Sequence, residues 1–475
     1  MKICSLYGAG FYYIPGTDTC VKMGGFVRGE WNANSYGSFA SQFNNNLAGR
    51  SAGSNDALRT RTQQQLTSRA RGVISWDIRS QTEYGTLRTY LRGGWQFSDG
   101  DPTIGATGAT AFLDRAFIQI GGFTFGKSQS FFDFFNTPAY SNQTPFLWAD
   151  TGGTGTPMLA YTAVFGSGLS ASLSLESHNE QLLPIVAVGA TGAAPAVSLT
   201  GVAGPNFGAG FSNALSNGGN KVPDVVANLR LDQAWGSAQI AGALHNNNAA
   251  YYTLPVNTAS SAGPSDAIGW ALGGGVKLNL PMLGAGDHMT IASNYCKGAT
   301  RYCSDPSVLT AQGPGYGLRN GSTVAVGWFD DAYYNTNRAA GGSLELPTVW
   351  NFIGGYSHNW NAKWNSTLVG VYNKYQANSN AIDTLVCANA INDATGVAGV
   401  GAGCTNFSSW QLGSRTTWRA VQNLDISLEV MYTKVDGAMQ GARFTSTVQG
   451  TPSTLVGGNG DLWSGIFRVQ HAFYP

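Results

Sequence analysis

The chain has 475 residues, of which 11% are charged, and its formal net charge is +1. Soluble proteins carry about 25% charged residues, whereas this chain is poor in charge and contains 64 glycines and 12% aromatic residues. The near-zero net charge argues against a nucleic-acid-binding surface, and the mean hydropathy of −0.10 argues against a bundle of membrane-spanning helices. The composition favours lipid-facing strands joined by polar loops.

Strands with a period of two residues recur from one end of the chain to the other. In the hairpin 71–97, which turns at Thr82–Gly85, the apolar Ile74, Trp76 and Ile78 alternate with polar residues, and four arginines share the polar face. Alternation of this kind puts one set of side chains on each face of a sheet. The predicted hairpins span residues 71–97, 111–135, 158–177, 224–244, 267–295, 346–375 and 410–435, between a first strand, 21–31, and a last strand, 462–474.

These elements add up to sixteen strands, in which short connections alternate with long ones. Outer-membrane barrels have this pattern, with an even number of strands of about ten residues, short periplasmic turns and long external loops. Closure leaves no unpaired edge in lipid, and a barrel of this size encloses a water-filled lumen. We therefore predict an all-β fold, a transmembrane antiparallel barrel over residues 21–475 that follows an N-terminal periplasmic segment, 1–20.

Two features of the chain bear on its path to and across the membrane: one long uncharged stretch and the residues after Met1. The uncharged stretch Leu182–Gly204 is long enough for a membrane-spanning helix, but it contains Pro184 and Pro195, and we interpret it as a low-complexity surface loop. No apolar signal-peptide core follows Met1, so we expect that any export signal was removed before this numbering begins.

The six cysteines form three local pairs: Cys4 with Cys20, Cys296 with Cys303, and Cys387 with Cys404. None has the spacing of a zinc or redox site. Each pair would close a short loop, which fits disulfides made in an oxidising compartment such as the periplasm. The alternative is six free, buried thiols.

Four segments resemble the porins of the alphaproteobacteria, the rhizobial and Brucella-type family. They are CSLYGAGFYYIPGTDTCVKMGGFVRGEW (Cys4–Trp31), RGVISWDIRSQTEYGTLRTYLRGG (Arg71–Gly94), AFIQIGGFTFGKSQSFFDFF (Ala116–Phe135) and GIFRVQHAFYP (Gly465–Pro475). The resemblance implies a trimeric general diffusion porin in outer-membrane lipid and lipopolysaccharide. It also implies that the loop after the fifth strand, about residues 136–157, folds into the lumen. Porins usually end on an aromatic residue, whereas this chain ends on Pro475.

Rings of charged side chains set the selectivity of a wide pore. The predicted pore-lining residues are Arg28, Arg71, Arg79, Arg88, Arg92, Arg115, Lys127, Asp133 and Asp150. A basic wall opposite an acidic loop would produce a transverse field across the pore. In the alternative interpretation, the arginines pair with Glu30, Asp77 and Asp133 and have a structural role only.

Passive diffusion of small hydrophilic solutes and ions is the function that this pattern favours. The alternatives are a substrate-specific channel, for example for sugars, an outer-membrane enzyme, and an adhesin-like surface protein. An enzyme is disfavoured because the only GxSxG match, Gly49–Gly53, lies in a polar loop rather than in the strand–turn–helix elbow that this motif needs. The five histidines are scattered, and we expect no metal and no cofactor.

Overall fold

The structure is a computed structural model that describes residues 3–34, 66–98, 109–142, 148, 150–152, 155–177, 183–188, 217–252, 262–304, 315–337, 342–390, 392–448 and 451–473. The motif Gly49–Gly53 and the terminal Pro475 lie outside the described residues.

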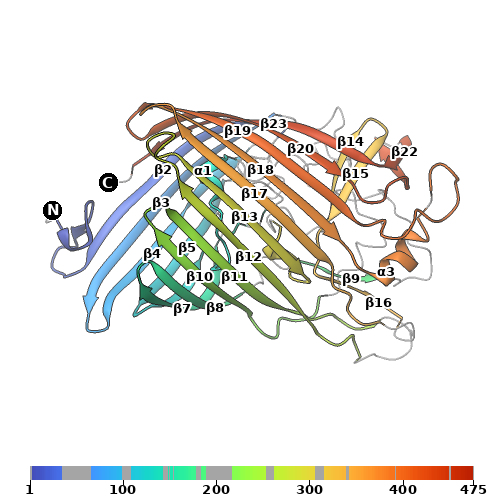
Figure 1. The fold of residues 1–475 in the computed structure, drawn as a ribbon, viewed down its shortest axis with the longest axis horizontal. Coiled ribbons are helices and arrows are strands. Elements are labelled where there is room, and N and C mark those ends of the chain that lie inside the picture. The colour runs from blue at the N-terminus through green and yellow to red at the C-terminus, as the bar shows by residue number, and fades with distance from the viewer. Residues whose placement is uncertain are drawn as a thin grey trace.

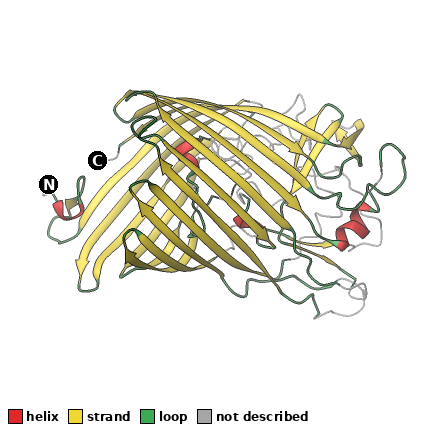
Figure 2. Ribbon diagram, viewed as in Figure 1, coloured by secondary structure: helices red, strands yellow, loops and turns green. Residues whose placement is uncertain are grey.

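Sixteen antiparallel strands form a closed barrel, as predicted (Figures 1 and 2). They are β2 (Cys20–Ala33), β3 (Leu66–Thr82), β4 (Gly85–Ser98), β5 (Ala109–Ile120), β6 (Phe123–Ser128), β7 (Thr156–Gly166), β8 (Leu169–Glu176), β10 (Asp224–Gln233), β11 (Gly236–Asn247), β12 (Ala267–Asn279), β13 (His288–Lys297), β17 (Thr348–Asn359), β18 (Trp364–Gln376), β19 (Phe407–Val421), β20 (Leu424–Asp436) and β23 (Asn459–Ala472). Each strand pairs with the next in this order, and β23 pairs with β2 to close the ring.

The local pattern of the chain explains the tight turns and the two faces of the wall. The turn after β3 lies at Thr82–Gly85, as predicted. Between β5 and β6 both turn residues, Gly121 and Gly122, have positive φ angles of 55° and 88°, as a two-residue hairpin turn requires. The alternation also holds, because Val27 is 60% exposed on the outside whereas Glu30 is 1% exposed inside.

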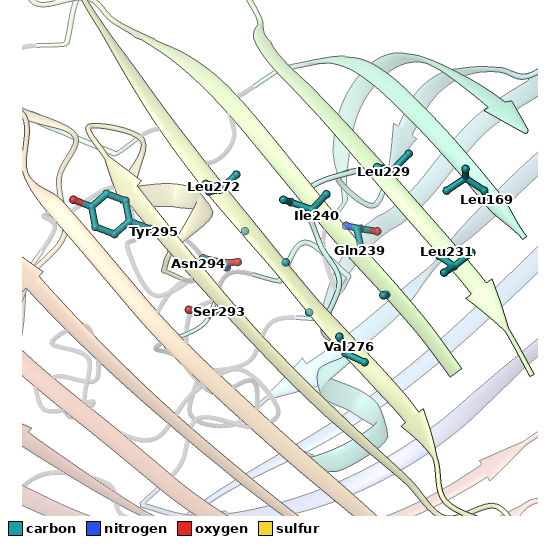
Figure 3. A pocket seen from close by; sticks show the side chains of 14 residues that line it. Leu169, Leu229, Leu231, Gln239, Ile240, Leu272, Val276, Ser293, Asn294 and Tyr295 are labelled. Atoms are coloured by element: carbon teal, nitrogen blue, oxygen red, sulfur yellow. The ribbon is translucent and has the colours of Figure 1, made fainter. Parts of the chain in front are cut away.

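Apolar side chains cover the outside of the barrel. On β10–β13 they surround a shallow hollow of ≈ 660 Å³, where Gly274 has no side chain between Leu272 and Val276 (Figure 3). Leu272 and Ile240 beside it are 51% and 56% exposed. Such a surface fits contact with lipid.

The long connections contain more secondary structure than the sequence predicted. Between β13 and β17 lie β14 (Gly315–Asn320), β15 (Thr323–Trp328) and β16 (Ala332–Asn335), and between β20 and β23 lie β21 (Arg443–Val448) and β22 (Thr451–Gly457). Strands β14, β15, β22 and β21 form a separate small sheet. It lies at the end of the barrel opposite the N-terminus, near the short helix α3 (Asn380–Ile382) (Figure 1).

Part of the predicted surface loop 182–204 is buried. Strand β9 (Ile185–Val188) pairs in parallel with β16, and all four of its residues are at most 3% exposed. They belong to a hydrophobic core that also contains Trp328 and Tyr333 from the connection before β17. The interpretation as a surface loop was therefore wrong for these residues, because a partner strand more than a hundred residues away covers them.

The three cysteine pairs are the disulfides Cys4–Cys20, Cys296–Cys303 and Cys387–Cys404. The first ties the N-terminal segment to the start of β2, which the two-residue strand β1 (Tyr12–Tyr13) also pairs with. This segment lies at the end of the barrel that carries the short turns (Figure 1). Among the described residues, no helix has the length and apolar character needed to cross a membrane.

Candidate pore and its constriction

The connection between β6 and β7 enters the barrel interior. We call residues 129–155 the inner loop; of these, the structure describes 129–142, 148, 150–152 and 155. The sequence placed the end of this hairpin strand at Phe135, but β6 ends at Ser128. The inner loop therefore begins earlier than the predicted residue 136, and Asp133 belongs to it rather than to a strand.

Polar side chains of the barrel wall hold the first half of the inner loop. The Gln239 side chain on β11 donates to the carbonyl of Phe132 (3.3 Å), and the Asn228 side chain on β10 donates to that of Phe131 (2.7 Å). The glycines of β12 make room, because a Cβ at Gly273 would lie 2.7 Å from the Phe132 ring. The loop thus packs tightly against the inside of β10–β12.

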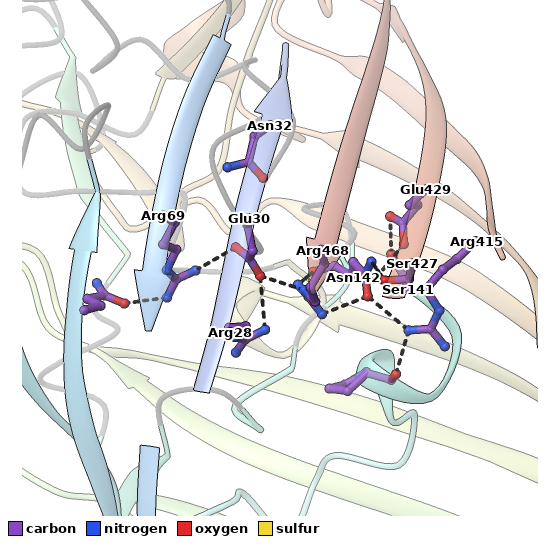
Figure 4. Close-up of polar contacts among 12 residues, drawn as sticks. Arg28, Glu30, Asn32, Arg69, Ser141, Asn142, Arg415, Ser427, Glu429 and Arg468 are labelled. Carbon is purple, nitrogen blue, oxygen red and sulfur yellow. Dashed lines mark hydrogen bonds and ion pairs between the residues drawn. The ribbon is translucent and has the colours of Figure 1, made fainter. Parts of the chain in front are cut away.

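The inner loop then continues through the short helix α1 (Thr137–Tyr140) to β13 and on to β20. The Tyr140 hydroxyl meets Thr290 Oγ1 of β13 at 2.5 Å. Glu429 of β20 accepts hydrogen bonds from the Ser141 hydroxyl (2.8 Å) and from the Asn142 backbone N–H. Because Glu429 is 1% exposed, this carboxylate is a buried clamp on the loop (Figure 4).

In addition to Glu429, two arginines of the barrel wall hold the inner loop. Arg415 of β19 donates to the Ala139 carbonyl (2.8 Å), and Arg468 of β23 donates to the Asn142 carbonyl (2.8 Å). Arg468 also donates from Nε to Glu30 at 2.7 Å. The loop is therefore connected through Arg468 to the charged side chains of β2 and β3 (Figure 4).

A set of eight arginines lies on β2–β5 and β23 around three carboxylates, and we call it the arginine wall. Its members are Arg28, Arg69, Arg71, Arg79, Arg88, Arg92, Arg115 and Arg468, and the carboxylates are Glu30, Asp77 and Asp114. Seven of the arginines form ion pairs with the carboxylates, whereas Arg115 donates to the backbone carbonyl of Asp114. Positive charge is thus in excess on this side of the interior.

Each carboxylate of the arginine wall serves more than one arginine. Glu30 lies 2.7 Å from Arg468 and 3.3 Å from Arg28. Asp77 binds Arg79 at 2.8 Å and Arg88 at 3.0 Å. The arginines therefore do pair with acids, as the alternative interpretation expects, although the acids are too few to neutralise them.

Asp114 was not among the predicted residues, and a β-bulge explains why. Arg92 pairs with Arg115, but Gly93 pairs with Leu113, which leaves Asp114 as an extra residue on β5. Strict alternation would turn Asp114 outward if Arg115 points inward. The bulge breaks the alternation, so that Asp114 lies 3.2 Å from Arg71 and 3.5 Å from Arg92.

The inner loop carries two acids near the arginine wall, Asp133 in its first half and Asp150 in its second half. Asp133 accepts from the Thr151 N–H (2.8 Å), Asp150 accepts from the Gly152 N–H (2.6 Å), and Arg115 donates to the Gly152 carbonyl (2.6 Å). Burial, followed by the nearby charge of Asp150, raises the pKa of Asp133 to about 7. Burial likewise raises the pKa of Asp150.

The structure groups most of the predicted lining residues but separates Lys127 from them. By register Lys127 lies opposite Ala116, on the face that carries Phe123 and Phe125, which are 44% and 42% exposed outside. Sequence reasoning missed Arg69 and Arg468 as members of the wall. Both sit on the polar face of an amphipathic strand, and that pattern could have identified them.

A closed sixteen-strand barrel with an apolar exterior and a charged interior is the architecture of an outer-membrane channel. A family model described as "Porin subfamily" matches residues 1–466. The chain belongs to this porin family.

Individual relatives agree with this assignment. Porin Omp2a of Brucella ovis is 27% identical over 197 residues, which cover 38% of this chain and 51% of that protein. Porin Omp2b of Brucella suis is 27% identical over 253 residues, which cover 51% of this chain and 56% of that protein. The chain thus spans about half the length of the curated relatives that it matches.

A solved structure shares the fold over nearly the whole chain. The outer membrane channel DcaP of Acinetobacter baumannii superposes with a TM-score of 0.55 at 14% sequence identity, covering 97% of this chain and 99% of that one. At this identity the likeness concerns the fold alone.

Proposed function

We propose that the protein is a general diffusion porin, which lets small hydrophilic solutes and ions pass through a water-filled lumen. One observation supports this most directly: a loop fixed inside the barrel faces a wall that contains eight arginines, seven of which share three carboxylates. Fixed charges in a narrow aqueous passage select solutes by size and charge.

The arginine wall and the acids of the inner loop would act as opposite sides of the narrowest part of the pore. Arg115 reaches the loop at Gly152, next to Asp150. Positive charge at the wall and negative charge at the loop would produce a transverse field that orients dipolar solutes. The places of Arg28, Arg71 and Arg79 in this wall support a pore-lining role for them.

We further propose that the protein acts as a homotrimer in outer-membrane lipid and lipopolysaccharide. A pore formed by one barrel repeated three times would close in three equal steps. The segment 1–20 would face the periplasm, because it lies at the end of the barrel that carries the short turns.

Recording single-channel currents in a planar lipid bilayer tests the proposal. We expect channels whose current rises linearly with voltage and which close in three equal steps. Saturable block of the current by a sugar would instead indicate a substrate-specific channel. The absence of channels from correctly folded protein would contradict a pore and favour an adhesin-like surface role.

A further inference from the structure

A small pocket lies between the inner loop and the inside of β10–β13, on the side of the short turns. Its volume is ≈ 180 Å³, and both loop residues such as Phe134 and Tyr140 and wall residues such as Arg230 and Lys277 line it. This is room for several water molecules, and hence for a small organic ion. A solute that has passed the inner loop would meet this pocket next.

Three polar side chains of the pocket have no partner among the residues that the structure describes: those of Lys277, Ser237 and Asn136. Ser237 and Lys277 sit opposite each other on β11 and β12. In contrast, Arg230 makes two hydrogen bonds to Asp232, at 2.8 and 2.9 Å. Lys277 is therefore the cation that the pocket leaves uncompensated.

These groups are suited to a carboxylate. A carboxylate only accepts hydrogen bonds, whereas a lysine ammonium, a serine hydroxyl and an asparagine amide can all donate them. Hydrogen bonds between an ammonium and a carboxylate are shorter and stronger than neutral ones. A cation such as an amine would instead face Lys277 without an unpaired acid to receive it.

The rest of the pocket is suited to an apolar tail. The Phe134 ring lies 5.7 Å from the guanidinium carbon of Arg230, which fixes that ring at the wall. The Tyr140 ring is held on the other side by its hydroxyl contact with Thr290. Two rings that flank one cavity favour a planar or short apolar group between them.

We propose that this pocket binds small organic carboxylates with a short apolar or aromatic tail, and holds them briefly on their way through the pore. The carboxylate pairs with Lys277 and accepts from Ser237, and the tail lies against Phe134 and Tyr140. The inference rests on the proposed diffusion function and names a solute class for it.

Titration calorimetry of the folded protein in detergent tests the pocket independently of conduction, with benzoate as the probe and uncharged benzamide as its isostere. We expect saturable benzoate binding that Lys277→Gln weakens about tenfold or more, since a charge-assisted hydrogen bond is lost. The matched control is Lys363→Gln, which removes the same charge from the turn before β18 and should leave binding unchanged. Equal binding of benzoate and benzamide overturns the proposal, and so does a Lys277→Gln variant that binds benzoate as tightly as the wild-type protein.

Bilayer recordings separate this proposal from the proposed function. Benzoate should reduce the current in a saturable manner in the wild-type protein and in Lys363→Gln, but not in Lys277→Gln. A channel that conducts without saturable benzoate block refutes the pocket and leaves the porin function intact. Absence of channels alongside normal benzoate binding refutes the porin function and leaves the pocket intact.

Discussion

Replacement of Glu429 by glutamine should loosen the inner loop without affecting the barrel. Glu429 accepts two hydrogen bonds from the loop, one from the Ser141 hydroxyl and one from the Asn142 N–H. The amide of glutamine has only one oxygen, so one loop donor loses its acceptor and faces an N–H group instead. The β20 backbone pairing with β19 and β23 is unchanged by this substitution.

The burial of Glu429 sets how strongly Glu429→Gln should loosen the inner loop. A hydrogen bond to a charged group contributes about 1.5–3 kcal/mol, and burial of Glu429 at 1% exposure removes the screening that weakens such bonds at a surface. Loss of one bond should therefore raise the population of the detached loop about tenfold to a hundredfold.

Hydrogen exchange of the peptide around Asn142, measured by mass spectrometry in detergent, checks this expectation. The exchange rate in Glu429→Gln should rise by that factor, and single-channel currents should become noisier in the open state. Asp436→Asn is the matched control, because Asp436 ends the same strand but is half-exposed beside Lys434. Equal exchange rates in the wild-type protein and Glu429→Gln would refute the role of Glu429 as a clamp.

Three further predictions concern charge, pH and the N-terminal segment. The double change Arg88→Glu, Arg92→Glu should move the reversal potential in a salt gradient toward cations; an unchanged potential would contradict the assigned pore face. Because the pKa of Asp133 is about 7, its carboxyl group ionises as the pH rises from 5.5 to 8.5. The ionised group stabilises the folded protein less, and its negative charge should increase the preference of the pore for cations. Asp133→Asn should abolish that change in preference. Replacing Cys4 and Cys20 by serine should cost about 3 kcal/mol of local stability and speed proteolysis of this segment, while the conductance stays the same.

The strands and their faces could be predicted because both depend on neighbours in the sequence. Alternation along β20 puts Glu429 and Leu428 on opposite faces, and Glu429 is 1% exposed inside whereas Leu428 is 57% exposed outside. Short turns such as Thr82–Gly85 pair residues that the chain brings together directly. The cysteine pairs follow the same principle, since each is separated by at most 17 residues.

Partners of the charged side chains could not be predicted in the same way. The bulge at Asp114 changes which face that residue takes, and nothing in the alternation indicates it. The clamp at Glu429 joins residues 287 and 288 positions apart, and residues that far apart meet only once the barrel has closed.

By itself, then, the sequence determined a sixteen-strand barrel with an apolar exterior, a charged interior and three local disulfides. The tertiary structure alone decided the path of the inner loop, the burial of Ile185–Val188 under a distant strand, and the sharing of three acids by seven arginines. The physical reason is that strand patterns arise from contacts between near neighbours, whereas the lumen is lined by side chains from strands that are far apart in the sequence.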